Sequence, residues 1–244
     1  MILFDIPLWH LIVALVVTFL GALVQGSVGF GLAVIAAPVL LVVNPEFVPG
    51  SMLIAALVLC GLLAVREKHS IIRKEVVVSS VSRLVTTVPT ALLISHVDTQ
   101  TFSIVFALVV IVAVGISFSG YHLPLTMTNL TIASAVSGIT NTISAIGGPP
   151  MAMVYQDQRG DHIRATLSVI FAIGTLFSIT CLAWVDEFHW RDVALGLALL
   201  PGILAGFALS RYTTPWLDKR GTRPAVLGIA ALSAVVILVR AIEI

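Results

Sequence analysis

Long apolar blocks separated by short polar stretches dominate the pattern of this 244-residue sequence. The blocks fall at 8–43, 47–65, 76–95, 101–119, 124–155, 163–184, 193–210 and 224–242. Most of them have the length of a single membrane-spanning helix, about 20 residues. Blocks 8–43 and 124–155 are too long, because straight helices of that length would measure about 50 Å against a hydrocarbon core of about 30 Å.

Each long block carries an interruption near its middle. The first reads VQGSVGFGLAVIAAPVL and the second reads VSGITNTISAIGGPPMA. Glycine weakens a helix, and proline removes a backbone donor. The pattern therefore predicts that each long block forms two shorter helices that meet at an unwound point.

Composition indicates that lipid is the solvent of most of the chain. Hydrophobic residues make up 59% and charged residues 10%, whereas a soluble domain carries roughly 25% charged residues. So few charges exclude a soluble monomer, since a domain of this size exposes much of its chain. The net charge of +1 offers no basic surface for nucleic acid. No zinc-protease, serine-hydrolase or Walker motif occurs, so we expect neither an enzyme nor a cofactor.

Charge placement predicts which loops share a side of the membrane. Basic residues concentrate in loops 66–75, 156–164 and 211–223, whereas loops 44–50, 95–100 and 185–192 hold few. The positive-inside rule makes the first group cytoplasmic. Ten of the thirteen basic residues then lie on one side, provided that block 124–155 enters and leaves from the cytoplasm. Block 8–43 must turn back from the opposite face.

The two halves of the chain match weakly at an offset of 112 positions. The offset aligns Val24 with Val136, Gly26 with Gly138, Ala33 with Ala145 and Pro38 with Pro150. It also superimposes the two broken blocks and places equivalent loops on opposite sides. The sequence thus predicts an all-α polytopic membrane protein with two inverted repeats, residues 1–120 and 121–244. Each repeat is a broken or re-entrant helix hairpin followed by three transmembrane helices, as in secondary transporters.

At these residues the chain resembles the sulfite exporter TauE/SafE family, also called the TSUP family. The resemblance rests on GALVQGSVGFGLAVIAAPVL in the first half and SAIGGPPMA in the second. It implies a permease or exporter of a small sulfur-containing anion, such as sulfite, sulfoacetate or another organosulfonate. It also implies a multi-pass protein of the bacterial inner (plasma) membrane.

The unwound points are the candidate substrate site. Helix N-termini leave about four free N–H groups each and carry a partial positive charge, so they can bind an anion. Glycine lets the backbone approach the anion, and nearby polar side chains add donors. The candidate residues are Gln25, Gly26, Ser27, Gly29, Gly31, Thr140, Asn141, Thr142, Ser144, Gly147, Gly148 and Pro149. The alternative is that these small residues serve only close helix packing.

Arg83 is a further candidate, because it stands eight residues into the apolar block 76–95. An arginine inside a membrane span usually faces the bundle interior or an aqueous path. The alternative is that its side chain snorkels to the cytoplasmic interface.

Other functions stay open at this point. Cys60 and Cys181 suggest a transmembrane thiol relay, although they are not equivalent in the two halves. A permease for a metal or other ion is a third hypothesis, against which stands the lack of a carboxylate well inside any span. The expected partners are a small anion and lipid, with a homodimer left open, and we expect no metal site.

Overall fold

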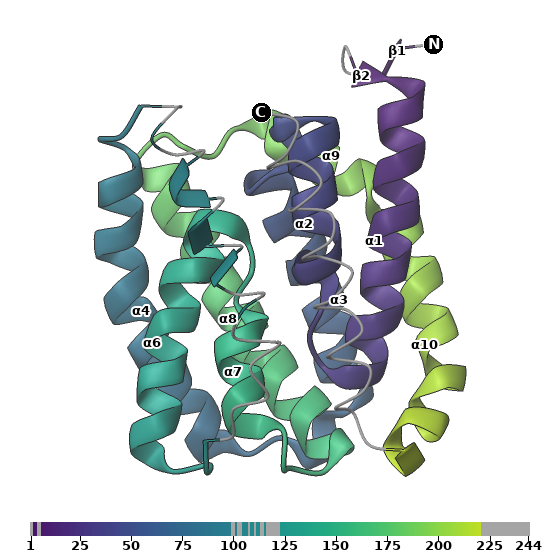
Figure 1. Cartoon of the computed structure of the whole chain (residues 1–244), viewed down its shortest axis with the longest axis vertical. Helices are drawn as coiled ribbons and strands as arrows, with labels where there is room; N and C mark the ends of the chain where they lie inside the picture. The colour runs from purple at the N-terminus through teal and green to yellow at the C-terminus, as the bar shows by residue number, and fades with distance from the viewer. Residues whose placement is uncertain are drawn as a thin grey trace.

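The protein is a bundle of long helices that run between two ends (Figure 1). The computed structural model describes residues 2–3, 6–98, 101, 104–106, 108–109, 111–112, 115 and 123–220. The expected span 224–242 lies outside the described residues, as does most of the expected span 101–119. The boundary expected at residues 120 and 121 also lies outside them, so the division into two repeats stays a prediction. Two short strands, β1 (Ile2–Leu3) and β2 (Ile6–Pro7), pair just before the first helix.

The first long block forms a broken hairpin, as predicted. Helix α1 covers Leu8–Val28 and helix α2 covers Leu32–Val43, with the break at residues 29–31. The two helices pack against each other, and Gly21 of α1 lies against the backbone of Leu32. The chain therefore turns back on itself instead of continuing in one direction.

The second long block does the same from the opposite end of the bundle. Helix α6 covers Met127–Ser144 and helix α7 covers Gly148–Tyr155, with the break at residues 145–147. The amide of Leu123, before α6, donates to the carbonyl of Met153 near the end of α7 at 3.1 Å. The block thus enters and leaves at one end of the bundle.

The remaining described helices run between the ends. Helix α3 covers Gly50–Arg66, α4 covers Arg73–Ile94, α8 covers Gly160–Trp184, α9 covers Trp190–Ala198 and α10 covers Leu200–Arg220. Single-turn 3₁₀ helices η1 (Pro45–Phe47) and η2 (Lys68–Ser70) flank α3. In the described part of the chain, four helices are long and apolar enough to cross a membrane. The pair α9 and α10 makes a fifth span if it is counted as one.

The expected single span over 193–210 is bent in the structure. Helices α9 and α10 meet at Leu199 with an angle of 45°. Pro201 explains the bend, because proline lacks an N–H and disfavours helical geometry in the residue before it.

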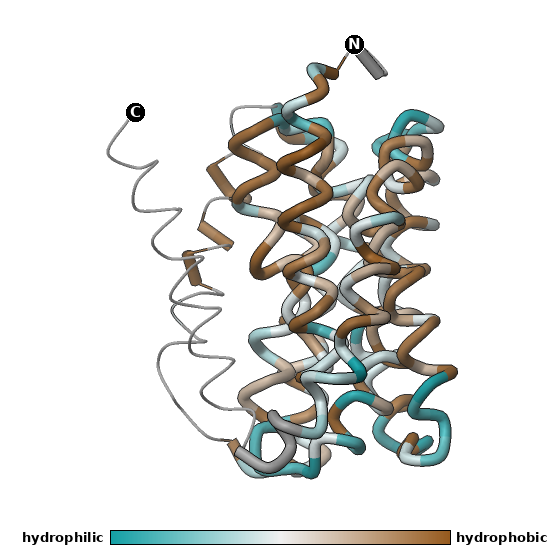
Figure 2. The backbone as a smooth tube through the Cα atoms, turned by 90° about the vertical axis from the view of Figure 1, so that its right-hand side faces the viewer, coloured by the Kyte–Doolittle hydropathy of each residue, from teal (hydrophilic) through white to brown (hydrophobic). Residues whose placement is uncertain are grey.

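Polar loops gather at the two ends, and hydrophobic positions fill the length between them (Figure 2). At the basic end, residues 66–72, 155–164 and 210–215 lie together: Ser70 Oγ donates to Asp161 Oδ2 at 3.1 Å, and Arg66 Nη1 donates to Ser210 Oγ at 2.8 Å. At the acidic end, residues 44–50, 94–97 and 182–192 line a common cavity of about 330 Å³. The loops thus group as the charges predicted, and the fold is that of an all-α polytopic membrane protein.

Close helix packing explains two glycines of α10. Gly202 and Gly206 are four residues apart on α10 and lie against the backbone of α1 at Leu15 and Phe19. A side chain at either glycine would collide with these carbonyl oxygens. Small residues at this spacing let membrane helices approach closely, and α1 and α10 lie side by side (Figure 1).

Candidate functional site

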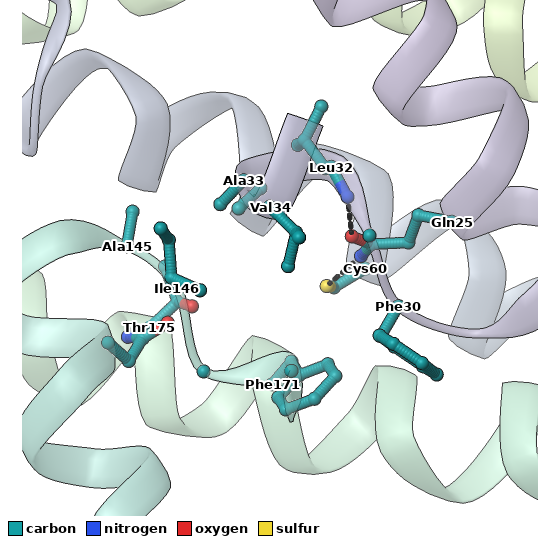
Figure 3. A pocket seen from close by; sticks show the side chains of 15 residues that line it. Gln25, Phe30, Leu32, Ala33, Val34, Cys60, Ala145, Ile146, Phe171 and Thr175 are labelled. Atoms are coloured by element: carbon teal, nitrogen blue, oxygen red, sulfur yellow. Dashed lines mark hydrogen bonds between the residues drawn. The ribbon is translucent and has the colours of Figure 1, made fainter. Parts of the chain in front are cut away.

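Glycine and one glutamine shape the first break. Gly29 and Gly31 have φ angles of 104° and 131°, which residues with a side chain rarely adopt. The amide of Gly29 donates to the carbonyl of Gln25 at 2.7 Å and ends α1. The Gln25 side chain then spans the break: its Oε1 accepts from the Leu32 amide at 3.0 Å, and its Nε2 donates to Cys60 Sγ at 3.2 Å (Figure 3).

The second break has a similar construction. Ala145 has a φ angle of 59° and its amide donates to the carbonyl of Asn141 at 2.8 Å, which ends α6. Ser137 Oγ donates to the carbonyl of Gly147 at 2.6 Å and holds the far side of the break. Asn141 Nδ2 donates to Ser178 Oγ of α8 at 3.1 Å.

The two breaks correspond at a spacing slightly different from the one in the sequence match. Gly29 and Ala145 each follow the last residue of a helix in the left-handed conformation, 116 positions apart. This spacing pairs Gln25 with Asn141, each four residues before its break. The offset of 112 found in the sequence is therefore four residues, about one helical turn, smaller than the spacing of the two breaks. It still pairs the correct segments.

A cavity lies between the two breaks. Both breaks line it, together with two residue pairs spaced four apart on the helices that follow them, α3 and α8. The lining residues are Gln25, Phe30, Gly31, Leu32, Ala33, Val34, Ala56, Cys60, Asn141, Ala145, Ile146, Gly147, Gly148, Phe171 and Thr175. Figure 3 shows Gln25 and Cys60 on the side of the first break and Ala145, Ile146 and Thr175 facing them. The volume is about 30 Å³, which holds one or two water molecules.

Arg83 lies directly behind the cavity wall. Its side chain is fully buried between α4, α6 and α8, so it does not snorkel to the interface. Its Nη1 donates to Ser137 Oγ and would lie 3.2 Å from a methyl group placed on Gly147. The guanidinium carbon stands 5.5 Å from the centre of the Phe171 ring.

The Arg83 guanidinium is a buried cation with unused donors. Its Nε and Nη2 have no hydrogen-bond partner among the described residues, and no carboxylate there pairs with it. Gly174 of α8 makes room for the group, since a side chain at that position would collide with the guanidinium. An unpaired buried charge is costly, so this arrangement favours an anion as the missing partner.

The structure places five of the candidate residues on the cavity wall: Gln25, Gly31, Asn141, Gly147 and Gly148. The other small or polar candidates do not line it; they are Gly26, Ser27, Gly29, Thr140, Thr142, Ser144 and Pro149. Thr142 instead bonds Ser178 at 2.9 Å, and the Ser144 hydroxyl donates back to the carbonyl of Thr140 at 2.8 Å.

Gly26 and Ser27 face the basic end instead of the cavity. Arg66 Nη2 donates to the carbonyl of Gly26 at 2.5 Å, and Arg164 Nη1 donates to the carbonyl of Ser27 at 3.2 Å. Both arginines also pair with Glu67 Oε1, at 3.1 and 3.2 Å. This group, the basic-end clamp, holds the last turn of α1 just below the first break.

Some lining residues carry no signal in the sequence. Phe171 and Thr175 stand in an uninterrupted apolar helix, where nothing distinguishes them from packing residues. Cys60 was a candidate for a thiol relay, not for the substrate site. Cys181 does not line the cavity. In the described part of the chain, no group of three His, Cys, Asp or Glu side chains could hold a metal ion.

Two broken hairpins that run in opposite directions and meet at a buried cavity are the arrangement of secondary transporters, a class of multi-pass membrane proteins. The family model for sulfite exporter TauE/SafE matches residues 13–237, so the chain belongs to this family. The resemblance seen in the two glycine-containing runs is thus confirmed, and the family is one of membrane permeases for sulfur-containing anions. No curated protein and no solved structure matches the chain.

Proposed function

We propose that the protein carries a small sulfur-containing anion, such as sulfite, sulfoacetate or another organosulfonate, across the bacterial inner membrane. The anion binds in the cavity between the two breaks, and the hairpins move to expose it alternately to each side. Family membership supports the class of substrate. The geometry around the cavity supports the site.

The observation that carries the proposal is the unpaired, fully buried guanidinium of Arg83 behind the cavity wall. Arginine carries its charge at all physiological pH values and offers donors in a fork that matches an oxyanion. A sulfonate against Gly147 would stand beside Nη1, the guanidinium nitrogen that faces this glycine, whereas Nε and Nη2 face Gly174 of α8. Its negative charge would balance that of the guanidinium, which has no carboxylate partner among the described residues.

The two helix starts contribute unequally to anion binding. Helix α2 begins at Leu32, and its first residues line the cavity, with the Leu32 amide bonded to Gln25. Helix α7 begins at Gly148 but continues with Pro149 and Pro150, which have no N–H to donate. Arg83 stands behind this second break and replaces the donors that the prolines remove.

Substrate binding requires movement, because a cavity of about 30 Å³ has room for one or two water molecules but not for a sulfonate. Phe30 packs on Gly148, so the two hairpins touch across the cavity. The basic-end clamp fixes the last turn of α1 at Gly26 and Ser27. Separation of the hairpins would widen the cavity, and release of the clamp would open it toward the basic end.

Flux into proteoliposomes tests the proposal, with sulfite, sulfoacetate and sulfate as substrates. We expect saturable flux of at least one sulfur-containing anion, and binding or flux of none of them would refute the anion assignment. Replacement of Cys60 and Cys181 by serine separates this function from a thiol relay, since a carrier keeps its flux without either thiol. A divalent-cation flux assay on the same vesicles addresses the ion-permease alternative.

A further inference from the structure

A buried carboxylate at the basic end is held by two side chains from the second hairpin and the helix after it. Glu75 of α4 has a side chain that is 9% exposed. Its Oε2 accepts a hydrogen bond from the Tyr155 hydroxyl at 2.7 Å and lies 2.9 Å from His162 Nε2. His162 is 18% exposed and therefore connects the carboxylate to the solvent at this end.

The same three residues are connected to the anion site through two helices. Tyr155 is the last residue of α7, and Gly148 at the other end of α7 lines the cavity. On α4, Glu75 and Arg83 are eight residues apart, about 12 Å along one helix face. Ser79 lies between them, and its buried hydroxyl has no partner among the described residues.

We propose that Glu75 and His162 form a proton-binding site that couples anion transport to protons taken up at the basic end. The inference rests on the proposed function of the cavity and adds its coupling ion. Tyr155 transmits the state of the pair to the second hairpin, because α7 is a short rigid helix between this cluster and the cavity.

Charge determines the direction of the coupling. The pair carries a net charge of −1 when it consists of a carboxylate and a neutral imidazole, and of zero after one proton binds. The negative state weakens anion binding near Arg83, whereas the protonated state does not. Over a separation of about 12 Å or somewhat more, one charge changes the anion's dissociation constant roughly three- to tenfold. The linkage is reciprocal, so anion binding also favours proton uptake.

Other charged groups stand on each element around the pair. They are Arg73 and Lys74 on α4, Asp161 and Arg164 on α8, Lys68 and His69 in η2, and Asp157 and Arg159 in the loop after α7. Some of these groups interact with residues other than Glu75. Asp161 accepts hydrogen bonds from Ser70 and Arg159, and Arg164 belongs to the basic-end clamp. Among the described residues, Tyr155 and His162 are the side chains with a hydrogen bond to the Glu75 carboxylate.

Binding of ethanesulfonate at pH 5.5 and pH 8 tests the proposal, because this sulfonate keeps one charge throughout the range in which histidine titrates. In the unaltered protein we expect the dissociation constant to rise three- to tenfold at the higher pH. His162→Gln retains a side-chain donor and Glu75→Gln retains an acceptor, and both should bind equally at the two pH values. His69→Gln is the matched control, since His69 is exposed at the same end and should leave the pH effect unchanged. Variants that keep the pH effect of the unaltered protein would overturn the proton site.

A second measurement needs no substrate. In a Cys181→Ser background, Cys60 reports the state of the cavity through its rate of reaction with a thiol reagent. At each pH, the labelling rate of the His162→Gln variant is divided by the rate of the protein with His162. We expect this ratio to differ between pH 5.5 and pH 8. The effect of pH on the thiol itself cancels, because it is common to both proteins. A ratio that is the same at both pH values would refute the coupling. A ratio that changes with pH in a protein that binds no sulfonate would retain the proton site and refute the assignment of the cavity as an anion site.

Discussion

Replacing Arg83 with methionine should weaken anion binding without weakening the fold. The substitution removes a buried positive charge and fills much of the same space with an apolar side chain. Nη1 would lie 3.2 Å from a methyl group on Gly147, so an anion against this glycine would stand about 6 Å from the charge. At about 6 Å and an effective dielectric constant near 20, the charge pair contributes roughly 2.8 kcal/mol, about a hundredfold in the dissociation constant.

Stability should respond in the opposite direction. In the absence of an anion, the guanidinium is a buried charge with no carboxylate partner among the described residues. Apolar replacements of buried charges are often neutral or stabilising. We therefore expect Arg83→Met to unfold at a temperature equal to or above that of the unaltered protein. A merely structural arginine would give the reverse result, because its loss would lower the unfolding temperature.

The assay combines sulfonate binding in detergent with thermal unfolding of the same samples. Lys74→Met is the matched control, since it removes one positive charge from the same helix at an exposed position. Solvent screens such a charge, so the control should change the dissociation constant less than threefold. The reasoning is refuted if Arg83→Met binds the sulfonate within threefold of the unaltered protein.

Three further predictions concern separate parts of the structure. Asn141→Leu should abolish flux while the protein still reaches the membrane, because it replaces a polar group on the cavity wall with a larger apolar side chain; normal flux would remove Asn141 from the site. Gly206→Ala should lower the unfolding temperature by collision with α1, whereas Gly61→Ala, which has open space around it, should leave it equal or higher. Arg164→Gln should loosen the basic-end clamp and speed thiol labelling of Cys60, and an unchanged rate would contradict its role as a closing contact.

The broken hairpins could be predicted because glycine and proline leave visible interruptions in apolar blocks. Gly29 and Gly31 adopt conformations that other residues avoid, and Pro149 and Pro150 begin a helix, so both breaks leave a local signature. The bend at Leu199 has a local cause as well, in Pro201, but a single proline in an otherwise apolar block did not stand out.

The site depends on contacts that the sequence pattern does not contain. Arg83 is buried because Gly138 and Gly174, on two other helices, leave space for it. Glu75 stands near the end of a span, where a solvated charge is the usual expectation, yet Tyr155 and His162 cover it from segments about 80 residues away. Such distant contacts become visible only when the helices are packed together.

The two halves are similar in construction and different in chemistry. Gln25 and Asn141 stand four residues before their breaks, but the arginine behind the second break, Arg83, comes from the first half of the chain. The acidic end carries carboxylates around its cavity, and the basic end carries the clamp and the Glu75 cluster. Such asymmetry fits a carrier whose two open states differ in their affinity for an anion.

Protection of Cys60 by substrate tests the central claim most directly, because this thiol lines the cavity between the two breaks. In a Cys181→Ser background, sulfite or an organosulfonate should slow the reaction of Cys60 with a thiol reagent. Half-maximal protection should occur at the concentration that half-saturates flux. A saturating anion that is transported but leaves the labelling rate of Cys60 unchanged would contradict a binding site between the two hairpins.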